Sequence, residues 1–99
     1  MKTLEEICQN VIDIEEGLMF GTILFKYDNL MSAMKAGHPM EILDGILANI
    51  YFTVMGNEEP PKEKLKETLE GFKTFKRTFE VKEMSKPIKD LSDYIKAMD

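Results

Sequence analysis

A change in the side of the apolar stripe within the first helical segment is the feature that most constrains the fold of this chain. When Thr3 to Ala36 is placed on a helix at about 100° per residue, the apolar side chains up to Leu18 cluster on one side. From Phe20 onward, the apolar side chains continue on the side that holds the carboxylates of the first half. A single straight helix with this pattern cannot bury both halves in one small core.

Two glycines, Gly17 and Gly21, lie where the stripe changes side. The chain can bend or break there, at a cost of up to about 1 kcal/mol per glycine relative to Ala, so that both halves face one core. Alternatively, the helix continues to Ala36 and each half packs on a different body, one of them a second copy of the chain. We favour the continuous helix, because no proline or cap residue between Glu15 and Gly21 separates two helices.

Start and stop signals divide the rest of the chain into helices. Thr3 and Glu6 have the spacing of a capping box, which predicts a helix start. Gly37 is typical of a helix end, and Pro39 suits the first turn of the next helix. That second helix closes at Gly56, and its buried face is indicated by Leu43, Ile46, Leu47, Ile50, Tyr51 and Val54.

The C-terminal part of the chain predicts two further helices. Pro61 fits the first position of a helix whose narrow apolar stripe is lost near Val81, and Ser85 with Pro87 can start a short fourth helix. We therefore expect residues 1–99 to form one all-α domain, a small helical bundle of three long helices and a short C-terminal helix. The stripe of the third helix consists of Leu65, Leu69, Phe72, Phe75 and Phe79.

Composition and charge exclude several classes of function. The net charge of −5 argues against a general nucleic-acid binder, which needs clustered Lys and Arg. The longest uncharged runs, 17–25 and 45–57, are shorter than the roughly 20 apolar residues of a membrane-spanning helix. Cys8 is the single cysteine and no signal peptide precedes it, so we expect a cytoplasmic protein. Residues 1–60 carry three lysines against ten carboxylates, whereas residues 61–99 carry ten Lys and Arg against eight.

The first helix has more apolar side chains than three shorter helices can cover. Apolar side chains that stay exposed for this reason usually mark an interaction surface. The sequence therefore predicts a non-enzymatic interaction module that forms a homodimer through the first helix and binds a protein partner. An alternative is an acidic inhibitor or decoy that occupies a basic site on its partner and binds less tightly in salt. The predicted contact residues are Phe20, Ile23, Leu24, Tyr27, Met31 and Met34, with Gly17 and Gly21 permitting close approach.

Two pairs of carboxylates predict an enzymatic alternative. Asp13 and Glu16 are one helical turn apart, and Glu41 and Asp44 repeat the spacing on the next helix, so antiparallel packing can bring four ligands to Mg²⁺. The sequence Glu41-Ile42-Leu43-Asp44 resembles the ExxD motif of MazG-type all-α nucleotide pyrophosphohydrolases, and the resemblance covers about residues 13–55. It implies a Mg²⁺ cofactor and a nucleotide substrate. Met19 stands where the family's EExxE motif has its last glutamate, so the first motif is reduced to Asp13-x-x-Glu16.

Overall fold

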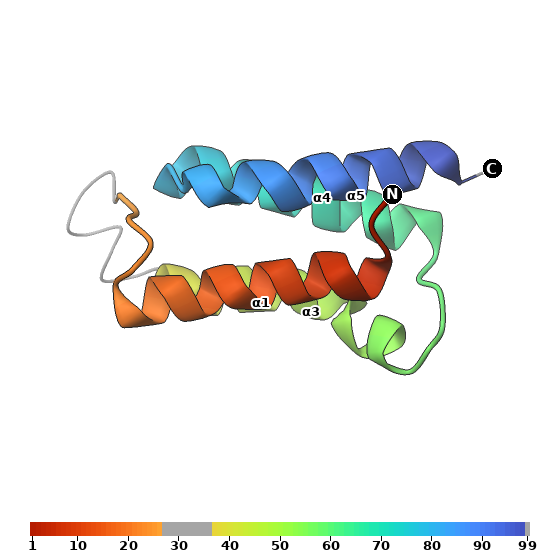
Figure 1. Ribbon diagram of the computed structural model, residues 1–99, viewed down its shortest axis with the longest axis horizontal. Helices are drawn as coiled ribbons and strands as arrows, with labels where there is room; N and C mark the ends of the chain where they lie inside the picture. The colour runs from red at the N-terminus through yellow and green to blue at the C-terminus, as the bar shows by residue number, and fades with distance from the viewer. Residues whose placement is uncertain (27–36, 99) are drawn as a thin grey trace.

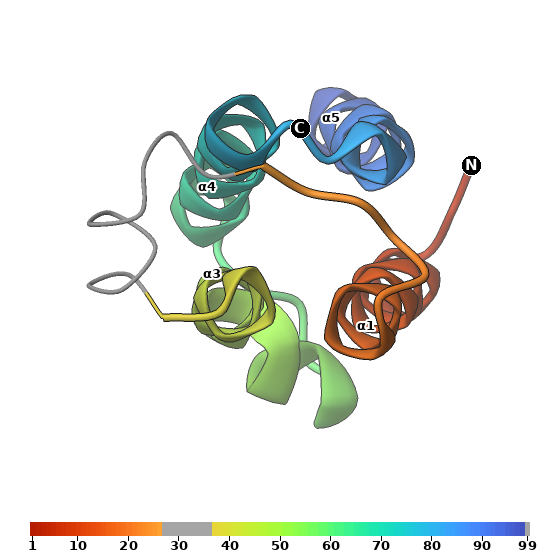
Figure 2. The ribbon, with the colours of Figure 1, turned by 90° about the vertical axis from the view of Figure 1, so that its left-hand side faces the viewer.

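The computed structural model describes residues 1–26 and 37–98. These residues form four α-helices and one short 3₁₀ turn, and no strand occurs among them, which confirms the predicted all-α bundle. Helices that follow one another in the sequence lie side by side and run antiparallel, and α5 closes the ring by packing beside α1 (Figures 1 and 2). The elements are α1 (Leu4–Phe20), α3 (Pro39–Met55), α4 (Lys62–Phe79), η1 (Lys82–Met84) and α5 (Ser85–Ala97).

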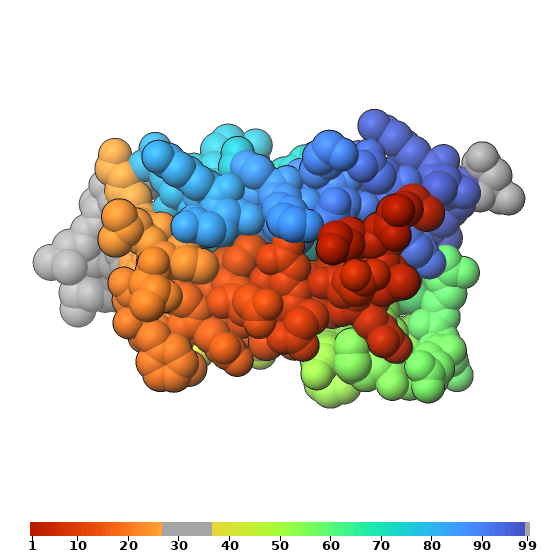
Figure 3. All heavy atoms as spheres, viewed as in Figure 1, coloured from red at the N-terminus to blue at the C-terminus, as the bar shows by residue number. Residues whose placement is uncertain are grey.

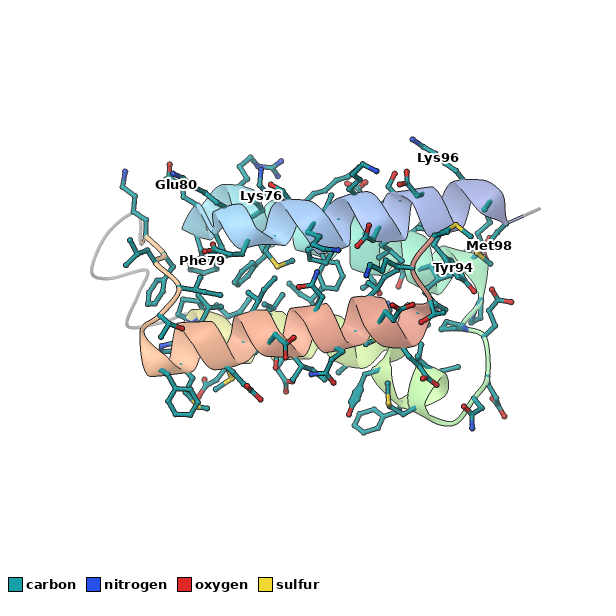
Figure 4. All side chains as sticks on the ribbon, viewed as in Figure 1. Lys76, Phe79, Glu80, Tyr94, Lys96 and Met98 are labelled. Atoms are coloured by element: carbon teal, nitrogen blue, oxygen red, sulfur yellow. The ribbon has the colours of Figure 1, made fainter. Side chains whose placement is uncertain are left out.

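The bundle consists of two layers, with α1 and α3 in one and α4 and α5 in the other (Figure 2). Each helix turns one apolar stripe toward the space between the layers, as expected for amphipathic helices. Side chains of α1 and α5 are in contact along the side of the bundle where these two helices meet (Figure 3). Phe79 lies between the layers at one end of the bundle (Figure 4). The largest fully buried side chains include Ile7, Leu18, Leu43, Leu47, Ile50, Leu65, Phe72, Phe75, Met84 and Leu91.

The prediction of a continuous helix from Thr3 to Ala36 is wrong, because α1 ends at Phe20. Gly21 has a φ of 79°, a left-handed conformation that terminates a helix and that glycine adopts without steric cost. The backbone N–H groups of Gly21, Thr22 and Ile23 all donate to the carbonyl of Gly17, the latter two at 2.9 and 3.0 Å. The residue that ends α1 is therefore Gly21.

Gly17 permits the chain to fold back after this stop. A Cβ atom added to Gly17 would lie 2.5 Å from Cδ1 of Ile23, which is too close for two carbon atoms. Ile23 therefore packs directly over the glycine and reaches the edge of the core. The close approach predicted for Gly17 occurs within the subunit, between residues only six apart.

The chain after α1 crosses to the far layer. The backbone N–H of Lys26 donates to the carbonyl of Phe79 at 2.8 Å, and its ammonium group pairs with the Glu80 carboxylate at 3.2 Å. These contacts attach residues 22–26 to the C-terminal end of α4. The predicted contact residues Tyr27, Met31 and Met34 lie outside the described residues.

Two of the other helix starts follow the sequence signals, whereas Pro61, predicted at the first position of a helix, is the residue just before α4. Thr3 and Glu6 form both hydrogen bonds of the capping box, each 3.1 Å long. At the start of α3, Nδ1 of His38 accepts a hydrogen bond from the N–H of Met40, so the only histidine is an N-cap. Within the described ranges, no helix is both long and apolar enough to cross a membrane.

Candidate protein-interaction surface

The outer surface of α1 and α3 carries the large apolar side chains that the core does not cover. Apart from Met1, every large hydrophobic side chain that is exposed among the described residues belongs to α1, to α3 or to the turn after α1. Phe20 is 72% exposed and Phe52 is 78% exposed. We call this outer surface the α1–α3 face. Its exposed large apolar side chains are Met19, Phe20, Phe52 and Met55, with Leu24 at its edge.

Helical spacing places these side chains in stripes opposite the core. On α3, Gly45, Ala48, Phe52 and Met55 follow one another at intervals of three or four residues, and all four are exposed. Because α1 and α3 run antiparallel, the end of α1 at Phe20 and the end of α3 at Met55 lie at opposite ends of the bundle (Figure 1). The face thus has an apolar patch near each end, separated by about 20 Å at 1.5 Å per helical residue.

The same face carries carboxylates: Glu16 lies one helical turn before Phe20, and Glu41 and Asp44 lie in the first two turns of α3. All charged residues in α1 and α3 are acidic, five in α1 and two in α3. Lys2 precedes α1 and pairs with Glu6 at 3.7 Å. Within the described part of the chain, Glu16, Glu41 and Asp44 form no ion pair. The α1–α3 face is therefore both apolar and anionic.

One carboxylate of α1 is buried instead of exposed. Glu15 is only 8% exposed, and its Oε1 atom has no hydrogen-bond partner among the described residues. Burial, followed by the negative charge of Asp44 and a hydrogen bond to that carboxylate, raises the pKa of Glu15 to about 8. At neutral pH, Glu15 is mostly protonated, so it adds little negative charge to the face.

The buried position of Glu15 was not predicted, although the sequence contains a signal for it. At about 100° per residue, Glu15 falls between Leu4 and Cys8 on the helical wheel, on the buried side of α1. Phe52 and Met55 were missed as well. They lie opposite the buried stripe of α3, so a search for apolar residues off that stripe would have found them.

The predicted interface residues have different positions in the structure. Phe20 and Leu24 are exposed and available for contact. Gly17 is buried and Ile23 is half-buried against the core, so these two residues are occupied within the subunit. Gly21 is exposed and ends α1.

The four carboxylates of the enzymatic alternative are all exposed. Asp13 accepts a hydrogen bond from Gln9 on its own helix at 3.0 Å. No group of three or more His, Cys, Asp and Glu side chains in the described ranges is placed to hold a metal ion. The structure therefore does not bring Asp13, Glu16, Glu41 and Asp44 together. Calorimetry with Mg²⁺ and an assay of pyrophosphate release are the direct tests of this alternative.

Comparison with known proteins gives no relative from which a function could be transferred. No protein-family model, curated protein or solved structure matches this chain. The geometry and charge of the α1–α3 face are therefore the basis for a functional proposal.

Proposed function

We propose that this protein is an interaction module that associates with itself through the α1–α3 face. The observation that carries the proposal is the placement of the exposed large apolar side chains on one side of the bundle, while α4 and α5 expose none within the described residues. Exposed apolar groups gathered on one side of a folded protein are typical of contact surfaces. Burying one phenylalanine side chain contributes about 1.5–3 kcal/mol, so Phe20 and Phe52 are the expected anchors.

The middle of the α1–α3 face suits close contact. Gly45 and Ala48 are exposed at its centre, and no atom lies within 4 Å of the position a Cβ of Gly45 would take. A partner can therefore approach the backbone of α3 between the two apolar patches. The carboxylates beside these small residues then determine which charges the partner must supply.

The experiment is a dilution series followed by light scattering. We expect the mass of the wild-type protein to rise with concentration above that of one chain. Phe52→Ser combined with Met55→Ser should weaken this association about tenfold or more, because both side chains are exposed in the subunit and buried in the contact. Lys62→Ser combined with Lys66→Ser, on α4, is the matched control and should associate like the wild type. A wild-type protein that stays monomeric at every concentration would refute the proposal.

The second candidate function, an acidic inhibitor or decoy, is favoured by the absence of Lys and Arg from α1 and α3. In that case the monomer should bind a Lys- and Arg-rich synthetic peptide, and the affinity should fall steeply as salt is added. Glu16→Gln with Glu41→Gln should weaken binding. Glu63→Gln with Glu67→Gln makes the same change on α4 and should leave binding of the peptide unchanged.

A further inference from the structure

The layer formed by α4 and α5 has the opposite charge from the layer formed by α1 and α3. Helix α4 carries six Lys and Arg against three Glu, and the segment from Lys82 to Ala97 carries four Lys against three carboxylates. Figure 2 shows the two layers on opposite sides of the bundle. Lys96 of α5 points away from α1 and α3 (Figure 4). The molecule therefore has an anionic side and a cationic side.

A hollow of about 680 Å³ lies in the cationic side, where α4 ends and α5 begins. Four of its seven lining residues are cationic, namely Lys73, Lys76, Arg77 and Lys82, and one is anionic, Glu80, which pairs with Lys26. Lys73 pairs with Glu70 at 3.5 Å, whereas Lys76, Arg77 and Lys82 form no ion pair within the residues described. A second hollow of about 440 Å³ continues along the groove between α4 and α5 and adds Lys96 and Lys89, of which Lys89 pairs at 2.9 Å with Asp93 in the same hollow.

Apolar residues also line this hollow. Val81 is buried, and Ile88 is half-buried and lines both hollows. We call the surface made by Lys73, Lys76, Arg77, Lys82 and Ile88 the basic groove. Cations beside a half-buried isoleucine are the complement of the α1–α3 face, where carboxylates lie beside exposed phenylalanines. An apolar patch that fits a hollow elsewhere on the same molecule forms a head-to-tail contact.

Charge also argues against a two-fold contact between two α1–α3 faces. Such a contact would bring Glu16, Glu41 and Asp44 of one copy close to the carboxylates of the other copy. Helices α1 and α3 provide no cation to neutralise them. Like charges brought together in a contact from which water is excluded disfavour association.

We infer that the α1–α3 face of one copy docks on the basic groove of a second copy, an inference that rests on the self-association proposed above. Glu16, Glu41 and Asp44 meet the cations of the groove, and the apolar patches of the face pack toward Ile88. The α1–α3 face and the basic groove lie on opposite sides of the bundle. An assembly therefore still has one free α1–α3 face and one free basic groove after each copy is added. Assembly therefore continues beyond a dimer, into a ring or an open chain.

Two charge-reversal variants test this arrangement by sedimentation velocity. The face variant carries Glu16→Lys and Glu41→Lys, and the groove variant carries Arg77→Glu and Lys82→Glu, all at exposed positions. Each variant alone should associate about tenfold or more weakly than the wild type, because like charges then meet across the contact. An equimolar mixture should assemble again, since each variant supplies a surface that complements the other.

Two controls accompany these variants. Lys62→Glu with Lys66→Glu makes the same change of charge at the other end of α4 and should associate like the wild type. Arg77 lies in the last turn of α4, where a cation favours the helix, so Arg77→Gln with Lys82→Gln provides a milder groove variant that should also weaken assembly. Circular dichroism checks that each variant is folded.

The alternative outcomes separate this inference from the proposed function. A groove variant that associates as tightly as the wild type, or a mixture that stays monomeric, overturns head-to-tail docking but leaves self-association through the α1–α3 face in place. A face variant that associates more tightly than the wild type indicates a two-fold contact and also overturns the inference. A wild-type protein that never associates refutes both proposals.

Discussion

A carboxyl group buried beside a second carboxylate makes the stability of a protein depend on pH, and Glu15, next to Asp44, is such a group. The folded protein raises its pKa from 4.5 to about 8, so the folded state holds this proton more tightly than the unfolded state does. The stability that Glu15 contributes is fully present below pH 4.5 and is lost as the pH rises to about 8. The slope is at most about 1.4 kcal/mol of unfolding free energy per pH unit.

Glu15→Gln should remove this dependence. We expect urea unfolding to give the variant a higher free energy of unfolding than the wild type above pH 8, because the amide never ionises. Glu16→Gln changes an exposed neighbour and should leave the pH dependence as it is. If Glu15→Gln keeps the wild-type slope, Glu15 is not the buried acid.

Cys8 should be inert in the folded protein. The thiol is fully buried, and burial, followed by the charge of Glu5, raises its pKa to about 11. Iodoacetamide at mildly alkaline pH should therefore modify the unfolded protein in urea at least about a hundredfold faster than the native protein, because native Cys8 is rarely a thiolate. Equal rates in both states would contradict the buried position.

At the scale of the helices, replacing either of two glycines by alanine should change the free energy of unfolding, but in opposite directions. Gly21→Ala should lower the free energy of unfolding by about 1–2 kcal/mol, because Gly21 has a positive φ that alanine disfavours. Gly45→Ala should raise it by about 0.5–1 kcal/mol, because Gly45 lies inside α3 with no atom within 4 Å of the added Cβ. Denaturant titration at low protein concentration measures both changes, and a loss of stability in Gly45→Ala would contradict this account.

The helix boundaries show what sequence patterns can predict in this chain. The capping box at Thr3, the proline at Pro39 and the restart at Ser85 all mark helix starts, because each depends on hydrogen bonds or dihedral angles within a few residues. The end of α1 was missed although Gly21 was noted, because a glycine inside an apolar run also fits a helix contact. Only the left-handed φ of Gly21 and the packing of Ile23 distinguish the two.

The candidate site was less predictable than the fold. Phe20 and Leu24 were predicted to be available for contact and are exposed, but Phe52, Met55 and the buried position of Glu15 were not foreseen. Exposure of these residues depends on which sides of α1 and α3 face each other, and that follows from the packing of all four helices. A sequence pattern gives the stripe of each helix but not its neighbours.

For the whole molecule, salt should distinguish the proposed contact from ordinary apolar association. Head-to-tail docking should weaken by about tenfold or more between about 0.05 M and about 0.5 M salt, because screening shortens the range of the attraction between the two charged surfaces. Sedimentation equilibrium measures this change, and thermal unfolding of a dilute sample serves as the control for fold stability. Association that salt leaves unchanged or strengthens would indicate an apolar two-fold contact instead.

The division of charge between the two layers also affects how copies meet before they touch. Carboxylates on one side and cations on the other give the molecule an electric dipole across its short dimension. Two copies that diffuse toward each other in dilute buffer exert a torque on one another, which turns unlike sides together and shortens the random rotational search. The placement of the acidic helices in one layer and the basic helices in the other therefore turns two approaching copies toward the orientation in which they bind.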